Sequence, residues 1–202
     1  RRSSLYRTLY YDTADWQLFR RHHAGAAVRF KVRARSYVES DLSFLEVKRK
    51  HRFTRRTVKN RLVTSGLATG LDSEAQRFLS GHYPLDAGRL EPRLWNSFTR
   101  VTLVSTARCE RLTLDLGILF HDGQAASSLG GLVVAEVKQE HLARDSDWMR
   151  VMRQWGIRPT GFSKYCIGVA LLHPEVRSNG FRPKLLMVQR LMQERRAHVH
   201  YQ

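Results

Sequence analysis

The chain has 202 residues, of which 42% are hydrophobic, and 35 lysines and arginines outnumber 18 aspartates and glutamates to give a net charge of +17. This size predicts one domain, or one domain with an appendage, and the charge indicates an anionic partner. The two cysteines, Cys109 and Cys166, exclude a disulfide framework and are typical of a reducing, cytoplasmic location. The longest apolar stretches, such as residues 167–172, are far shorter than the ~20 residues that cross a bilayer.

The predicted elements follow one another as strands and helices along the chain. Strands are indicated by runs of β-branched and aromatic residues, several with alternating polarity. In chain order, these segments are 5–11, 28–37, 42–50, 98–105, 110–120 and 132–140. Helices are indicated by capping residues followed by apolar residues at helical spacing. They are 15–22, 72–79, 146–155, 163–172 and, as a basic amphipathic helix, 183–197.

The segments between these elements are less regular. Residues 51–59 are very basic, residues 87–96 are predicted as helical or irregular, and the glycine- and serine-rich stretch 121–131 is predicted as a loop. Most strands are joined by short connections, which favour antiparallel pairing. The sequence therefore predicts an α+β fold built on an antiparallel sheet or barrel.

Three predicted strands share one pattern, in which charged residues alternate with apolar ones. The pattern runs through residues 28–35, 44–50 and 134–138. Side chains alternate between the two faces of a strand, so Arg29, Lys31, Arg33 and Arg35 share one face. A charged face of an antiparallel sheet is usually solvated. The alternative is that several such faces line one cavity, whose arginines, lysines and carboxylates would hold a phosphate chain and a divalent metal ion.

Five short motifs resemble those of the VTC domain, the polyphosphate-polymerase branch of the triphosphate tunnel metalloenzymes within the CYTH-like superfamily. They are LYYDT at 9–13, KVRARSY at 31–37, FLEVK at 44–48, EVK at 136–138 and FSKYC at 162–166. Their order and approximate spacing match from about residue 5 to about residue 172. The resemblance implies an antiparallel β-barrel that forms a basic tunnel, with covering helices, over residues 1–175. Residues 176–202 would then form a basic C-terminal helical extension.

The resemblance also assigns roles to single residues. The residues expected to clamp phosphates and act in catalysis are Arg33, Arg35, Lys48, Arg100, Arg111 and Lys164. The residues expected to bind substrate are Lys31, Lys59, Arg61, Lys138, Arg158 and Ser163. Glu136 and Glu46 are the carboxylates expected to hold Mn²⁺ or Mg²⁺. By residue chemistry, Glu46 also fits a salt bridge to a cation of the tunnel, and Lys59 and Arg61 also fit a solvated basic loop.

Two departures from the family pattern concern the completeness of the predicted tunnel. The family begins with a basic strand ahead of the LYYDT motif, and this chain, which begins at Arg1 without a methionine, starts too late to contain it. We therefore expect a piece of a longer protein with an incomplete barrel. The family pattern also has a second lysine three residues before Lys164, where this chain has Gly161. Arg158 is the substitute that the sequence offers nearby.

The resemblance implies an enzyme that uses ATP and Mn²⁺ or Mg²⁺ to extend polyphosphate. With water as the acceptor, the same site would be a triphosphatase or tripolyphosphate hydrolase. A third alternative is a module that binds polyphosphate, inositol phosphates or RNA without turnover. Nucleic acid is disfavoured because aromatic residues such as Phe30 and Phe98 alternate with the charges or begin strands, as packing residues do. The oligomeric state and a membrane-facing role of the C-terminal helix stay open.

Overall fold

A sheet of eight strands organises the computed structural model, which describes residues 2–54, 56–106, 108–140 and 146–199. The strands are β1 (Arg2–Asp12), β2 (Val28–Tyr37), β3 (Leu42–His51), β4 (Thr57–Thr64), β5 (Glu91–Val104), β6 (Glu110–His121), β7 (Ala126–Ser128) and β8 (Val134–Gln139). Their order is β4-β3-β2-β1-β5-β6-β7, β8 also pairs with β6, and every pair is antiparallel. Within the described ranges no pairing joins β4 to β7 or β8, so the sheet is open, and the β-barrel that the resemblance implies is not closed by these strands.

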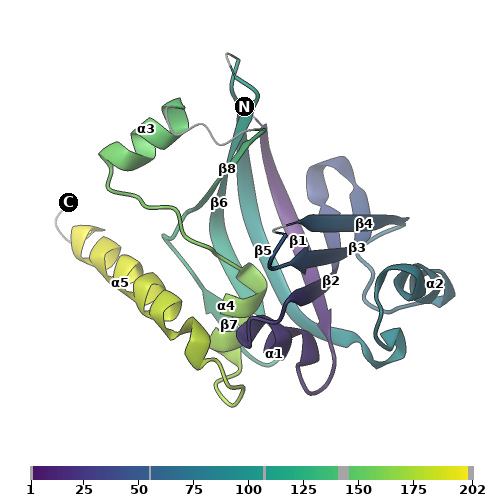
Figure 1. Cartoon of the computed structure of the whole chain (residues 1–202). Coiled ribbons are helices and arrows are strands. Elements are labelled where there is room, and N and C mark those ends of the chain that lie inside the picture. The colour runs from purple at the N-terminus through teal and green to yellow at the C-terminus, as the bar shows by residue number, and fades with distance from the viewer. Residues whose placement is uncertain (1, 55, 107, 141–145, 200–202) are drawn as a thin grey trace.

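Five helices within the described residues complete the α+β architecture. They are α1 (Gln17–His23), α2 (Ser73–His82), α3 (Asp147–Gln154), α4 (Lys164–Leu172) and α5 (Arg182–Val199). Three short 3₁₀ turns are η1 (Val38–Ser40), η2 (Ala87–Arg89) and η3 (Asn179–Phe181). The sheet bends so that β2, β3 and β4 cross in front of the long strands β1, β5 and β6, and α1 packs beside α4 (Figure 1). In the described part of the chain, none of the helices is both long and apolar enough to span a bilayer.

The bend of the sheet coincides with irregularities in the long strands. The pairing of β1 with β5 shifts register between Tyr10 and Tyr11, and the pairing of β5 with β6 shifts between Ser97 and Thr99. Gly117 of β6 has a φ of 61°, which favours glycine because a Cβ would be strained there. Such bulges bend a strand and increase its twist. Beyond Gly117, β6 exchanges its neighbour β8 for β7.

Two apolar clusters lie on opposite faces of the bent sheet. The outer cluster joins alternate residues of β1, β2 and β3 to α2, through residues such as Leu9, Val32 and Leu79. The inner cluster joins β5 and β6 to α1, α4 and α5, and α5 contributes the buried Val188. Because α4 belongs to the inner cluster, its N-terminus is held against the concave face of the sheet. The boundary at residue 175 between the domain and its extension stays a prediction.

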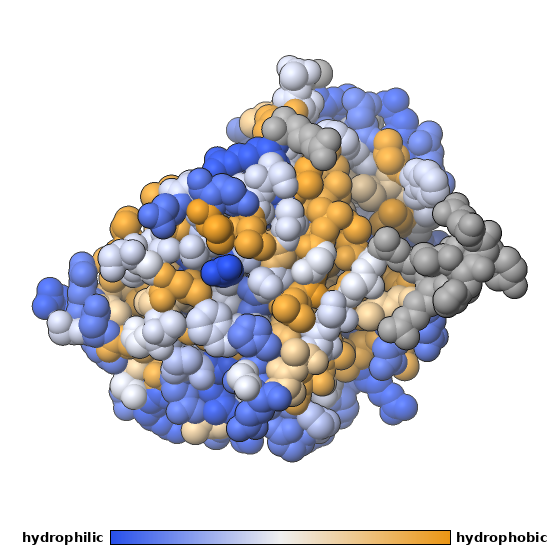
Figure 2. Space-filling model, turned by 180° about the vertical axis from the view of Figure 1, so that it is seen from behind, coloured by the Kyte–Doolittle hydropathy of each residue, from blue (hydrophilic) through white to orange (hydrophobic). Residues whose placement is uncertain are grey.

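Part of the outer face of the sheet is apolar and uncovered. On β6, Thr113 and Asp115 are buried on the concave side, whereas Leu114 and Leu116 alternate with them and Leu116 is 36% exposed. Apolar residues form a band on the face seen from behind (Figure 2). A half-exposed antiparallel sheet usually turns its polar side chains toward solvent. Here β6 turns them inward, which makes the concave face the place to look for chemistry.

All six predicted strands and all five predicted helices are confirmed, and three other segments need correction. Residues 91–96, predicted as helical or irregular, begin β5, and the register shift next to Pro92 accommodates a residue that has no N–H to donate. The basic segment and the apolar run after it contain β4, whose cations pair with β3 across the hairpin. The predicted loop 121–131 contains the short strand β7. The first depends on β1, a partner strand distant in sequence, and the second on ion pairs that local patterning does not show. The third is a strand of three residues that pairs with the end of β6 just before it.

Candidate functional site

The charged residues of β2 form a row on the concave face and are largely withdrawn from water. The row is Arg29, Lys31, Arg33 and Arg35, and Arg35 is only 7% exposed. The apolar residues between them pack into the outer cluster. Alternate residues of a strand are spaced ~6.7 Å apart, so the four cations span ~20 Å. This face is therefore a lining within the molecule, whereas a solvated face would leave the arginines exposed.

Glu46 of β3 holds the first cluster of cations together. It is fully buried, and the backbone register places it opposite Arg33 of β2 on one side and Arg61 of β4 on the other. Arg33 Nε donates to Oε2 at 2.6 Å, Arg61 Nε donates to Oε1 at 2.7 Å, and Lys59 Nζ lies 3.5 Å from Oε1. Burial raises the pKa of Glu46, but Arg33 and Arg35 outweigh it and hold the pKa at about 2. Glu46 is therefore ionised and its charge is already compensated.

Asp115 of β6 organises the second cluster. Arg100 of β5 approaches it with both arms of its guanidinium group, with Nε donating to Oδ1 at 2.6 Å and Nη2 to Oδ2 at 2.8 Å. Lys164, the first residue of α4, donates to the same Oδ2 and lies over the Phe98 ring at 4.3 Å. Arg100 in turn lies over the Tyr6 ring at 5.0 Å. Burial raises the pKa of Asp115, but the hydrogen bond from Arg100 and the charge of Lys164 lower it overall.

A cavity of about 260 Å³ lies where β2 and β3 meet the N-terminus of α4. Its cationic lining residues are Arg29, Lys31, Lys48, Lys50 and Lys184. Lys31 Nζ donates to Ser163 Oγ at 2.8 Å, and the same oxygen caps α4 by accepting from Cys166 N at 3.2 Å. The free N–H groups and the dipole at a helix N-terminus favour anions. The cavity therefore combines several cations with a second source of positive potential.

Lys48 shows that the two sides of the bent sheet approach each other. Burial, reinforced by Lys31 and Arg33, lowers the pKa of Lys48 to about 8, while the carboxylate of Glu136 opposes the decrease and Lys138 adds to it. Lys48 lies on β3 and the last two residues lie on β8, and four strands separate β3 from β8 in the sheet. The electrostatic interaction of Lys48 with Glu136 and Lys138 therefore crosses the concave space between β3 and β8. We call this charged concave face of the sheet the cradle.

Most of the predicted site residues gather in this cradle. Those in the two carboxylate clusters or the cavity are Lys31, Arg33, Arg35, Lys48, Lys59, Arg61, Arg100, Ser163 and Lys164. Glu136 and Lys138 are half exposed on β8, with Nζ and Oε1 3.6 Å apart. Arg111 is exposed near the start of β6, and Arg158 is exposed in the loop between α3 and α4. In the part of the chain that the structure describes, neither arginine lines the cavity or joins a carboxylate cluster.

Lys184 of α5 lines the cavity but was not among the predicted site residues. Its Nζ donates to Thr160 Oγ1 at 3.0 Å, and a Cβ added to Gly161 would lie 4.0 Å from this nitrogen. A cation thus stands beside the position where the family pattern has its second lysine. No local signal identifies Lys184, because its place depends on how α5 packs. Arg29 and Lys50, in contrast, follow from the alternation of charge along β2 and β3.

The carboxylates of the cradle differ in how well they fit a metal ion. The described residues contain no group of three His, Cys, Asp or Glu side chains placed to hold one. Glu46 does not fit the predicted metal role, because Arg33 and Arg61 occupy both of its oxygens. Glu136 fits better, since its carboxylate is half exposed at the cradle. Mg²⁺ is typically held by one or two carboxylates together with substrate phosphates and water, so a single protein carboxylate is compatible with its chemistry.

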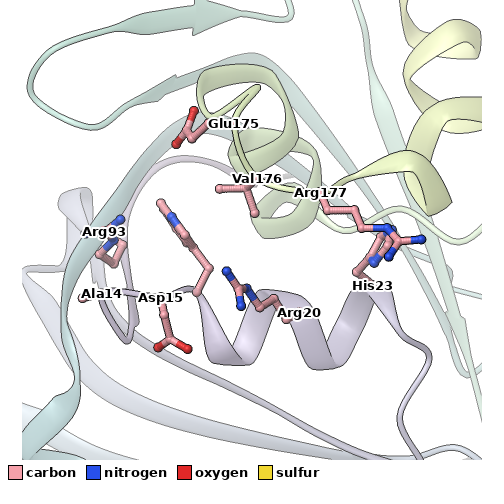
Figure 3. A pocket seen from close by; sticks show the side chains of 9 residues that line it. Ala14, Asp15, Arg20, His23, Arg93, Glu175, Val176 and Arg177 are labelled. Carbon is pink, nitrogen blue, oxygen red and sulfur yellow. The ribbon is translucent and has the colours of Figure 1, made fainter.

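A larger cavity of about 620 Å³ opens between α1 and the loop after α4 (Figure 3). Figure 3 shows Arg20, Arg93 and Arg177 around it together with the carboxylates of Asp15 and Glu175. None of the residues predicted for the site lines this cavity. Its mixed charge suits a phosphate chain less well than the cradle does, so the smaller cavity belongs to the candidate site.

Of the comparisons with known proteins, the one with family models agrees with the sequence motifs. The family model of the VTC domain matches residues 1–173. A search of curated proteins found no match. Among solved structures, a candidate adenylate cyclase from Bacillus halodurans is 16% identical with a TM-score of 0.48, and the match covers 80% of this chain and 79% of that one. The PH1819 protein from Pyrococcus horikoshii OT3 is 13% identical with a TM-score of 0.45, and the match covers 85% of each chain.

Proposed function

The chain belongs to the VTC domain family, and we propose that it is a metal-dependent polyphosphate polymerase that transfers the γ-phosphate of ATP to a growing polyphosphate chain. The observation that carries the proposal is the row of cations along β2, which is largely withdrawn from water. Its length of ~20 Å suits an extended chain of phosphates, whereas a single phosphate would need only a compact cluster. The approach of β3 to β8 across the concave face supports a tunnel that encloses the chain.

The reaction joins two phosphates and releases ADP. A terminal oxygen of the polyphosphate attacks the γ-phosphorus of ATP, the bond from that phosphorus to the β,γ-bridging oxygen breaks, and the bond electrons leave with ADP. The attacking oxygen is already ionised at neutral pH, so the step needs no strong general base. Phosphoryl transfer depends mainly on in-line positioning and on neutralising the charge of the moving group.

The residues of the cradle supply this positioning and neutralisation. Arg33, Arg35 and Arg100 are forked donors that match the geometry of phosphate oxygens, and Lys48 and Lys164 act as point charges. Glu46 holds Arg33 and Asp115 holds Arg100 in place before substrate arrives, through contacts of 2.6 Å each. Arg35 is placed by its hydrogen bond to Thr8 Oγ1 at 3.2 Å. Preorganised donors of this kind need little rearrangement during the reaction.

Glu136 is the residue that would hold the divalent ion, together with oxygens of the substrate phosphates. When bound, Mg²⁺ or Mn²⁺ would neutralise part of the negative charge of the substrate phosphates. The proposed substrates are therefore the metal complex of ATP and polyphosphate.

The direct test is to incubate the purified chain with ATP and Mn²⁺ and to follow the products by ³¹P NMR. We expect internal polyphosphate resonances to grow together with those of ADP. Orthophosphate and ADP without polymer would overturn the polymerase in favour of a hydrolase. Unchanged ATP from a folded chain that still binds tripolyphosphate would overturn it in favour of a binding module.

Two variants locate the activity in the cradle. Arg33→Gln removes a fork from the concave face, and we expect the rate to fall about 100-fold, as for other preorganised charged donors. Arg49→Gln is the matched control, because Arg49 is exposed on β3 and alternates to the opposite face from Lys48. A rate for Arg33→Gln equal to that of Arg49→Gln would contradict the assignment, provided that urea denaturation shows both variants to be folded.

A further inference from the structure

Positive charge is distributed unevenly along the cradle. Arg33, Arg61 and Lys59 share Glu46, and Arg100 and Lys164 share Asp115. The cavity at the N-terminus of α4 has five cations in its lining and no aspartate or glutamate among its described lining residues. An incoming anion would therefore gain most where the cations are not yet compensated.

Two side chains indicate that this cavity is built to accept an anion. The Nε of Arg29 is buried and has no hydrogen-bond partner among the residues that the structure describes. Lys31 bonds only to a neutral hydroxyl, that of Ser163, within the same described part, and burial lowers its pKa. A buried donor without a partner is costly, and an anion in the cavity would satisfy it. His22 also lines the cavity, and burial lowers its pKa to about 3, so it adds no charge at neutral pH.

Lys184 reaches this cavity from a helix that follows the part of the chain matched by the family model. The match ends at residue 173, and α5 begins at Arg182. Val188 is 1% exposed in the inner apolar cluster, and the partly buried Leu185 packs against the same cluster. This packing fixes the N-terminal turns of α5 beside Thr160 and Gly161. Lys184 is thus held at the cavity by the hydrophobic core.

We propose that α5 completes a phosphate subsite at the N-terminus of α4, in which Lys184 binds a phosphate group of the linear polyphosphate directly. The inference rests on the proposed function, because it assigns a subsite within the same cradle. Lys184 faces the ligand together with Arg29, Lys31, Lys48 and Lys50. Lys184 is then part of the binding site, and the anion-binding unit extends beyond the family match, which ends at residue 173.

The test is isothermal titration of the full chain with inorganic tripolyphosphate. We expect Lys184→Gln to weaken binding about tenfold, the size of one charge-assisted hydrogen bond, and Lys184→Arg to keep affinity within about twofold. Arg182→Gln removes an equal charge from the same helix outside the cavity lining and should leave affinity unchanged. Equal losses of tripolyphosphate affinity in Lys184→Gln and Arg182→Gln would show that only the total positive charge matters, and would overturn the proposal.

A second pair of variants separates this inference from the sequence-based alternative. If Arg158→Gln loses affinity and Lys184→Gln does not, the cation beside Gly161 is Arg158 and the proposal is wrong. Failure of the polymerase assay leaves the subsite standing as long as the parent binds tripolyphosphate and Lys184→Gln binds it less tightly. A parent chain that binds no tripolyphosphate overturns both proposals.

Discussion

The hydroxyl of Tyr165 donates a hydrogen bond to the carboxylate of Asp12, although 153 residues separate them in the sequence. Asp12 also accepts from the backbone N–H groups of Leu18 and Phe19 at 2.8 and 2.9 Å, at the start of α1. One buried carboxylate therefore joins β1, α1 and α4. This contact links the LYYDT and FSKYC motifs, and it places Lys164 at the cradle through its neighbour in α4.

Removing the Tyr165 hydroxyl should destabilise the fold. Tyr165→Phe leaves the buried Asp12 carboxylate with one donor fewer, and we expect a loss of about 1–3 kcal/mol in the free energy of unfolding, measured with urea. Tyr83→Phe is the matched control, because the buried Tyr83 hydroxyl has no hydrogen-bond partner within the described ranges. Its removal should be neutral or slightly stabilising. Equal effects of the two substitutions would show that the contact contributes nothing to stability.

Gly168 should tolerate no larger residue, because α4 packs closely on the sheet. A Cβ at this position would lie 2.7 Å from carbons of both Leu94 and Phe120. We expect Gly168→Ala to cost about 1–3 kcal/mol of stability in urea denaturation, in spite of the better helix propensity of alanine. Gly81→Ala in α2 meets nothing within 4 Å and should stabilise by about 0.5 kcal/mol. A stabilised Gly168→Ala variant would contradict this packing.

The sequence predicted those parts of the cradle that follow from the residue pattern of a single strand. The period-two alternation on β2 and β3 places Arg33 and Lys48 on one face whatever the rest of the fold does. The resemblance to the VTC domain then selected the lining over the solvated face, and the burial of Arg35 agrees with it. The salt-bridge alternative for Glu46 also follows from local chemistry, because a carboxylate among arginines finds partners in adjacent strands.

Other features depend on packing between distant segments and had no local signal. Lys184 lies at the cavity because Val188 of the same helix is buried in the core. The sequence around Lys184 is that of any basic amphipathic helix. The strand β4 lies within a basic segment whose sequence is typical of a loop. Its place in the sheet depends on the pairing of Arg61 with Glu46 of β3. Whether a sheet closes into a barrel likewise depends on the pairing of its two edge strands, which the pattern of a single strand does not determine.

Glu46 should make the fold sensitive to acid. Its pKa in the folded chain is about 2, below the ordinary value of 4.5, so its stabilisation is complete above about pH 5 and is lost as the pH falls toward 2. The shift corresponds to about 3 kcal/mol. We expect urea denaturation at pH 7, 5, 4 and 3 to show this decline in the parent and a shallower one in Glu46→Gln, since the amide does not titrate. Parallel curves for the two chains would contradict the assignment.

Lys48 should make anion binding depend on pH in the alkaline range. Its pKa of about 8 in the free chain means that it loses its charge above that pH, whereas a bound phosphate favours the charged form. We therefore expect tripolyphosphate affinity to fall about tenfold between pH 7 and 9.5, with proton uptake on binding near pH 8.5. Titration calorimetry in buffers of different ionisation enthalpy measures that uptake.

The variant Lys48→Arg keeps its charge and should lose part of the pH dependence. The rest should remain, because the pKa values of Lys31 and Lys164 are also lowered by burial. Arg49→Gln, on the opposite face, should behave as the parent, and a Lys48→Arg variant with undiminished proton uptake would exclude Lys48 as the titrating group.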